Sequence, residues 1–219
     1  MNIKYNSKEI QKGDTFIALK TNNDGHKYIN DAIKNGATKV IAEYGSYPVE
    51  TLLVDNTKEY LVKYLYENYY QEIKDLKLIG ITGTNGKTTT CMLLHNMLNM
   101  LGRKTAYIGT NGFYINKFIK ELPNTTPEIL DIYELLIEVK KEGCEFVCIE
   151  ASSHGLAQNR LENLKFDYAI FTNLTHEHLG YHKTMKNYAL AKQKLFTMLR
   201  NNKYAIINND DNYKNYFIL

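Results

Sequence analysis

The sequence lacks the patterns of membrane, secreted and disulfide-bonded proteins. No window approaches the roughly 18 apolar residues of a membrane-spanning helix. The first ten residues contain no apolar stretch like that of a signal peptide. The cysteines, Cys91, Cys144 and Cys148, are odd in number and show no Cys-x-x-Cys spacing. We therefore expect buried, reduced thiols in a cytoplasmic protein with no membrane partner.

Several functional patterns are also missing. There is no Gly-x-Ser-x-Gly nucleophile elbow and no His-Glu-x-x-His zinc motif. The net charge of +3 comes without a dominant basic run, so nothing indicates nucleic-acid binding. No internal repeat or low-complexity segment is present. With 44% hydrophobic and 23% charged residues, the composition is that of an ordinary globular protein.

The most informative stretch that is present is Leu78–Thr90. Its apolar beginning predicts a strand, a glycine-rich turn follows, and a helical pattern then begins. Glycines at 83 and 86 allow main-chain N–H groups to close around an anion at the positive end of the helix dipole. Lys87 adds a charge for the β- and γ-phosphates, and Thr88 offers a hydroxyl to Mg²⁺. The layout is that of a phosphate-binding loop.

This stretch departs from the general P-loop pattern, which would need glycine where Ile81 stands. Gly-Thr-Asn-Gly-Lys-Thr-Thr is a tighter variant of it. The alternative interpretation is a glycine turn with a solvated lysine. The strand before the turn and the helix after it favour the phosphate loop.

The chain is expected to form two α/β domains, residues 1–75 and 76–219, separated at the polar stretch Gln71–Asp75. In the first, we predict strands at 13–19, 39–42 and 51–54 and helices at 28–35 and 57–70. In the second, strands and helices alternate, which indicates a mostly parallel sheet. The predicted strands there are 104–110, 146–151, 168–172 and 204–208, with a weakly indicated hairpin at 113–122.

Two helices are predicted in the second domain besides the one after the glycine loop. One runs to Lys141, and its start reads as a Thr126 N-cap followed by proline at the first helical position. The other spans 183–199. Polar residues follow four of the predicted strands: the glycine loop, Asn111, residues 150–154 and 172–173. Because parallel strands carry ligands at their carboxyl ends, we expect one site along this edge.

Glu150 ends an apolar strand, where an unpaired buried carboxylate would be costly. Beside a bound Mg²⁺-ATP it would serve as a metal ligand, and a salt-bridged strand end is the alternative. Residues 175–182 form the densest histidine cluster. We favour one imidazole on Mg²⁺ over a zinc site. On composition alone, Lys192 reads as a solvated helix lysine.

Together these stretches resemble the Mur ligase family over nearly the whole chain, and most of all the ligases that add the third peptide residue to UDP-N-acetylmuramoyl-L-alanyl-D-glutamate. The matching stretches are residues 6–8, 13–16, 24–26, 83–89, 124–127, 150–160, 176–182 and 191–196. The resemblance implies a small N-terminal α/β UDP-sugar-binding domain followed by a P-loop-type, mostly parallel ATPase domain that is incomplete, with a third, C-terminal domain absent.

The resemblance also implies an ATP-dependent ligase of peptidoglycan synthesis that works through an acyl phosphate. Its partners would be UDP-N-acetylmuramoyl dipeptide, ATP with Mg²⁺, and an amino acid, lysine or diaminopimelate. Alternatives are a truncated, non-catalytic nucleotide-binding homologue and another amide ligase of the superfamily, of the folylpolyglutamate or poly-γ-glutamate synthetase type.

The family's site residues fall on matching positions of this sequence. ATP would be held by Gly83, Thr84, Asn85, Gly86, Lys87, Thr88 and Thr89. Mg²⁺ would be held by Thr88, Glu150, His178 and a carbamylated Lys192, whose carbamate replaces a repelling ammonium with an anionic oxygen ligand. The uridine end would contact Ser7, Thr21, Asn22 and Asn23. The muramoyl-peptide end would contact Asn124, Thr125, Thr126, Ser152, Gln158 and Arg160. The chain departs from the usual family pattern at Asn6, Lys8, Glu177 and Gly180.

Overall fold

The structure, a computed structural model, describes residues 2–21 and 23–218. It divides the chain into two compact units, Met1–Asn68 and Tyr69–Leu219. The division falls inside helix α2 (Thr57–Ile73), whereas the expected boundary follows residue 75. Asn22, one of the expected uridine contacts, lies outside the described residues.

The first unit is built on a four-stranded parallel sheet in sequential order. Its strands are β1 (Ile3–Lys4), β2 (Thr15–Ile17), β3 (Lys39–Ala42) and β4 (Glu50–Leu53), and its other elements are η1 (Ser7–Glu9), η2 (Gly25–Tyr28) and α1 (Ile29–Lys34). Ile29 and Ala32 of α1 share an apolar core with Phe16 and Val40 of the sheet. The helix ends before Gly36, whose φ of +114° favours glycine.

The second unit is built on a seven-stranded sheet of order β11-β10-β5-β9-β6-β7-β8. Its strands are β5 (Lys77–Thr82), β6 (Thr105–Gly109), β7 (Gly112–Ile115), β8 (Lys117–Lys120), β9 (Phe146–Glu150), β10 (Phe166–Phe171) and β11 (Leu199–Ile207). The strands from β11 to β6 pair in parallel, and β7 and β8 are antiparallel. The expected α/β class, mostly parallel sheet and hairpin are therefore confirmed.

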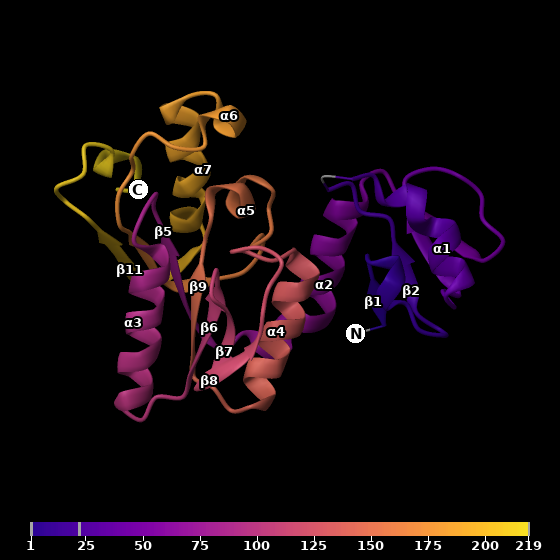
Figure 1. Ribbon diagram of the computed structural model, residues 1–219, viewed down its shortest axis with the longest axis horizontal. Coiled ribbons are helices and arrows are strands. Elements are labelled where there is room, and N and C mark those ends of the chain that lie inside the picture. The colour runs from indigo at the N-terminus through magenta and orange to yellow at the C-terminus, as the bar shows by residue number, and fades with distance from the viewer. Residues whose placement is uncertain (1, 22, 219) are drawn as a thin grey trace. The chain divides into compact units, whose positions relative to one another are not determined.

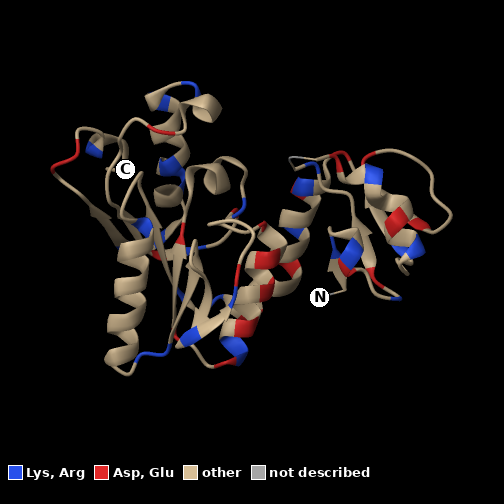
Figure 2. Cartoon of the chain, in the orientation of Figure 1, with Lys and Arg blue, Asp and Glu red and all other residues tan. Residues whose placement is uncertain are grey.

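Helices cover both faces of this sheet (Figure 1). The helices of this unit are α3 (Lys87–Met100), α4 (Ile129–Lys141), α5 (Ser153–Ala157), α6 (Leu179–His182), α7 (Met185–Thr197) and the short η3 (Lys214–Tyr216). Cys91 of α3 packs on the face that carries Ile79, Ile81 and Cys148. Helix α3 has no Lys, Arg, Asp or Glu after Lys87, and Figure 2 therefore draws most of its length in tan.

Helix α7 lies close against the opposite face of β5. A Cβ at Gly80 would come within 2.5 Å of Leu195 Cδ1 on α7. Glycine at this position therefore permits the close approach of helix and strand. All three cysteines are buried and unbridged, as expected. Within the described residues, the helices are too short or too polar to cross a membrane.

Some expected boundaries are wrong. Helix α4 begins at Ile129 with Glu128 as its N-cap residue, and Thr126 does not cap it. The Thr126 hydroxyl instead donates to the main-chain oxygen of Glu150, 2.7 Å away. The last strand is longer than expected and starts at Leu199, while α7 ends at Thr197. Helices α5 and α6 are too short to leave a periodic signal in the sequence.

Candidate functional site

The strand ends expected to carry the site lie side by side. In the sheet, Glu150 of β9 pairs with Ile81 of β5, and Phe171 of β10 pairs with Thr82. The segments that follow these strands therefore leave the sheet at one edge. They are the glycine loop, the turn after Glu150 and the turn after Phe171, as the sequence predicts.

The glycine loop requires glycine at both predicted positions. Gly83 has a φ of +149°, and a Cβ there would lie 1.9 Å from Thr172 Oγ1. Gly86, the N-cap residue of α3, has a φ of +83°. Asn173, which follows β10, holds the glycine loop through two hydrogen bonds. Its main-chain oxygen accepts from Thr84 N at 2.7 Å, and its Oδ1 accepts from Asn85 N at 3.0 Å. The strand, turn and helix of a phosphate loop are therefore present.

Lys87 folds back over this loop. Its Nζ donates to the main-chain oxygens of Gly83 and Thr84, at 3.0 and 2.8 Å. Burial lowers the pKa of Lys87 below its usual range. The first N–H groups of α3 have no acceptor inside the helix. Together with the Lys87 side chain, they give the start of α3 the donors that an anion requires. Thr89, also expected to contact ATP, is exposed on the first turn of this helix.

Glu150 is fully buried and receives four hydrogen bonds. Oε1 accepts from Tyr107 Oη and from Thr110 N, and Oε2 accepts from Thr88 Oγ1 at 2.9 Å and Thr110 Oγ1 at 3.2 Å. All four donors are neutral, so none of them balances the charge of the carboxylate. A hydroxyl and a carboxylate are oxygen ligands that Mg²⁺ prefers, and Thr88 and Glu150 fit such an ion.

Lys192 does not extend into solvent, so the composition-based interpretation is wrong. Its side chain is 1% exposed, and its Nζ donates to the main-chain oxygen of Gly83 at 2.7 Å. The ammonium position lies 4.5 Å from the centre of the Tyr188 ring. Burial, with a smaller contribution from repulsion by Lys87, lowers the pKa of Lys192 to about 6. At neutral pH the amine is therefore mostly uncharged.

Three histidines gather beside Tyr188. The ring centroids of His154 and His178 are 5.0 Å apart, and those of His154 and His182 are 5.5 Å apart. Burial lowers the pKa of His182 to about 4. Within the described residues, no group of three or more His, Cys, Asp or Glu side chains is arranged to hold a metal. The His178 ring packs edge-on against the Tyr188 ring, with centroids 5.9 Å apart.

The predicted peptide-binding residues surround the turn that follows Glu150. Thr126 Oγ1 accepts from Ser152 N at 3.0 Å, and Ser152 Oγ accepts from Gly155 N as the N-cap of α5. Thr125 Oγ1 lies 3.0 Å from Thr110 Oγ1, which itself bonds Glu150. Asn124 is exposed. The loop at 124–126 is thus hydrogen-bonded to the same strand end that carries Glu150.

Arg160 is buried and paired inside the protein. Its Nε lies 2.9 Å from Glu128 Oε1, and its other nitrogens donate to the main-chain oxygen of Thr126 and to Gln158 Oε1. The family resemblance implied that Arg160 contacts the muramoyl-peptide end, and it did not indicate the pairing with Glu128. No sequence pattern links these two residues, which the turn after β9 brings together.

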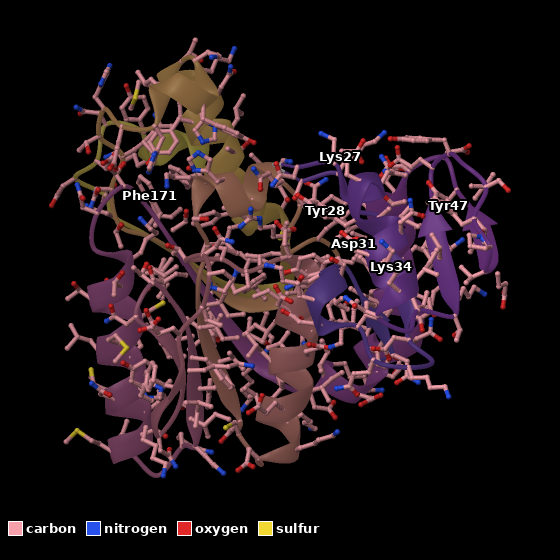
Figure 3. The ribbon with its side chains drawn as sticks, turned by 45° about the vertical axis from the view of Figure 1, so that its right-hand side comes forward. Lys27, Tyr28, Asp31, Lys34, Tyr47 and Phe171 are labelled. Carbon is pink, nitrogen blue, oxygen red and sulfur yellow. The ribbon has the colours of Figure 1, made fainter. Side chains whose placement is uncertain are left out.

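A separate cavity of about 620 Å³ lies in the first unit. It is lined by Tyr5, Asn6, Ser7, Lys8, Leu19, Thr21, Asn23, Gly25, Tyr28, Asp31, Lys34 and Asn35. Three expected uridine contacts, Ser7, Thr21 and Asn23, are therefore collected at one cavity. Tyr28, Asp31 and Lys34 follow one another along η2 and α1 in Figure 3.

Comparison with protein families matches residues 81–219 to the Mur ligase middle domain. The chain belongs to the Mur ligase family. This Mur ligase chain is 41% identical over 216 residues to the UDP-N-acetylmuramoyl-L-alanyl-D-glutamate--2,6-diaminopimelate ligase of Fusobacterium nucleatum, an alignment that covers 96% of the chain and 44% of that protein. The chain thus spans a little under half the length of this relative.

Solved structures agree with this assignment. A structure of UDP-N-acetylmuramoyl-L-alanyl-D-glutamate--2,6-diaminopimelate ligase matches with a TM-score of 0.80 and 32% identity, covering 99% of this Mur ligase chain and 44% of that one. A MurF ligase from Thermotoga maritima in complex with ADP matches with a TM-score of 0.67 and 25% identity, and the match covers 95% of this chain and 45% of that one.

Proposed function

We propose that the chain supplies the UDP-sugar-binding and ATP-binding parts of a cytoplasmic ligase that forms an amide bond on UDP-N-acetylmuramoyl-L-alanyl-D-glutamate in peptidoglycan synthesis. The observation that carries this proposal is the Glu150 carboxylate, which is buried among neutral donors and hydrogen-bonded to Thr88 at the start of the phosphate-loop helix. The 41% sequence identity between this chain and the diaminopimelate ligase of Fusobacterium nucleatum supports the proposed substrate. It also favours diaminopimelate over lysine as the added amino acid.

The proposed reaction has two steps. The substrate carboxylate attacks the γ-phosphorus of ATP, which forms an acyl phosphate and releases ADP. The amine of the incoming amino acid then attacks the acyl carbon, releases phosphate and loses a proton, which leaves the amide. In such phosphoryl transfers the protein mainly positions the reactants and stabilises charge. Lys87 and the N-terminus of α3 would hold the phosphates through direct contacts.

Mg²⁺, when bound, would neutralise charge on the phosphates. We propose Thr88, Glu150 and His178 as residues that hold it, with Lys192 as a fourth after carbamylation. In that modification the Lys192 nitrogen attacks the carbon of CO₂ and loses a proton, giving an anionic carbamate. The reaction requires a neutral amine, and the pKa of about 6 leaves Lys192 neutral at physiological pH.

The two ends of the sugar nucleotide would bind at different places. We propose that the cavity with Ser7, Thr21 and Asn23, together with Asn22, takes the uridine end. Of the residues proposed for the muramoyl-peptide end, Asn124, Thr125, Ser152 and Gln158 are at least partly exposed and would contact it. Thr126 and Arg160 are buried and would hold the loop in shape.

Calorimetric titration of the 219-residue chain tests this proposal. We expect binding of UDP-N-acetylmuramoyl-L-alanyl-D-glutamate, and separately of a non-hydrolysable ATP analogue in the presence of Mg²⁺. The variant Glu150→Gln keeps the shape of the side chain but removes its charge, so it should lose the Mg²⁺ dependence of nucleotide binding. A chain that is folded by circular dichroism and binds neither ligand would contradict the proposal.

A further inference from the structure

The two carboxylate oxygens of Glu150 have different surroundings. Oε1 accepts from the main-chain N–H of Thr110 at 3.0 Å and from the hydroxyl of Tyr107. Among the described residues, the donors to Oε2 are the hydroxyls of Thr88 and Thr110. A main-chain N–H points in a fixed direction, whereas a threonine hydroxyl rotates to suit its neighbours. Oε1 is therefore held by donors that Oε2 lacks.

The Tyr107 hydroxyl is itself fixed in direction. It accepts a hydrogen bond from Asn111 N at 3.2 Å, which leaves its own proton for Glu150. The Tyr107 side chain is fully buried, and its ring packs edge-on against Tyr114 with centroids 5.5 Å apart.

The side chains of Glu150 and Tyr107 lie directly against the backbone of Gly109. A Cβ at Gly109 would lie 2.3 Å from Glu150 Oε1 and 2.5 Å from the Tyr107 hydroxyl oxygen. The carboxylate and the phenol thus occupy the space that a side chain at position 109 would need. Glycine there permits β6 to approach the end of β9 at this point.

We infer that Tyr107 is a positioning residue, which fixes Oε1 of Glu150 so that Oε2 is the oxygen offered to a divalent cation. The inference rests on the proposed function, because it assumes that Mg²⁺ with nucleotide binds at Thr88 and Glu150. Tyr107 lies behind Glu150 on the neighbouring strand and acts only through it. Residues that orient a metal ligand in this way influence metal affinity strongly.

The test is the Mn²⁺ affinity of the 219-residue chain, measured by electron paramagnetic resonance in the presence of a non-hydrolysable ATP analogue. Tyr107→Phe removes the hydroxyl and keeps the ring, and we expect it to weaken Mn²⁺ binding about tenfold. Affinity for the analogue in the presence of a chelator should stay unchanged, which a general loss of structure would not allow. Tyr114→Phe, which alters the ring packed against Tyr107, is the matched control.

The outcomes separate the two proposals. If the unaltered chain binds nucleotide without any metal dependence, the proposed function is contradicted, and the inference about Tyr107 is overturned with it. If it binds Mn²⁺ and Tyr107→Phe binds it equally well, Tyr107 has no positioning role. Gly109→Ala gives an independent measurement should Tyr107→Phe not fold, because the added methyl group displaces Oε1 directly. Unchanged Mn²⁺ affinity in folded Gly109→Ala would likewise overturn the inference.

Discussion

The Lys192 amine donates a hydrogen bond of 2.7 Å to the main-chain oxygen of Gly83, a residue 109 positions earlier in the chain. This bond joins helix α7 to the glycine loop across the face of β5. It places a lysine, 1% exposed, beneath the loop that we propose to hold ATP. Burial at this position leaves the amine poorly solvated, and burial lowers the pKa of Lys192.

Lys192→Met should change how stability depends on pH. The pKa of Lys192 is about 6 in the folded chain, against 10.5 as its ordinary value. Between these values the unfolded chain binds more protons, so the stability of the unaltered protein rises with pH by up to about 1.4 kcal/mol per unit. Lys192→Met should remove this rise and be the more stable protein near pH 7. Urea unfolding at several pH values measures both effects.

Lys194→Met is the control for that measurement. Lys194 lies one half-turn further along α7, and its Nζ donates to Asn159 Oδ1. It should leave the pH dependence of unfolding as it is in the unaltered chain. A pH dependence that is the same in Lys192→Met and the unaltered protein would show that Lys192 titrates normally.

Lys87→Ala should weaken ATP binding strongly. The side chain spans the loop from α3 to the main-chain oxygens of Gly83 and Thr84, and its loss removes the positive charge closest to the proposed phosphates. We expect at least a tenfold loss of affinity, about 1.4 kcal/mol, by calorimetry. Lys117→Ala, on the exposed strand β8, is the control. Equal affinities in the two variants would argue against a phosphate loop.

Gly83→Ala should destabilise the second unit more than Gly102→Ala. Both glycines have positive φ, +149° and +76°, so alanine is strained at either position by about 1 kcal/mol or more. At Gly83 the new methyl group would also lie 1.9 Å from Thr172 Oγ1, whereas nothing lies within 4 Å at Gly102. Chemical unfolding of both variants gives the difference, and equal losses would mean that the loop moves freely away from Thr172.

Arg160→Met should cost about 3 kcal/mol or more of stability, because it leaves the buried Glu128 carboxylate without its guanidinium. Arg103→Met is the comparison. Arg103 pairs with Glu145 at 3.0 Å, but its side chain is 59% exposed, so its loss should cost less than about 1 kcal/mol. Similar losses in the two variants would show that the Arg160–Glu128 pair contributes little.

Much of the fold was predictable because its signals are local. Short apolar runs predicted most strands, and the stretch from Leu78 to Thr90 predicted its strand, turn and helix correctly. Thr126 was misassigned as a helix cap for a tertiary reason. Its hydroxyl donates to the main-chain oxygen of Glu150 at the end of β9, which is distant in the sequence but adjacent in the fold. Tyr107, a donor to Glu150, carries no sequence signal beyond its place in a strand.

The sequence by itself determined the strand, glycine turn and helix of the proposed phosphate loop, because the glycines at 83 and 86 act on the backbone next to them. It also placed Glu150 at the end of an apolar strand. Only the tertiary structure decided the environment of these groups. Helical periodicity says which face of α7 Lys192 occupies, but not that β5 and the glycine loop cover that face. The packing of α7 at Gly80 buries the amine, and burial is what lowers its pKa.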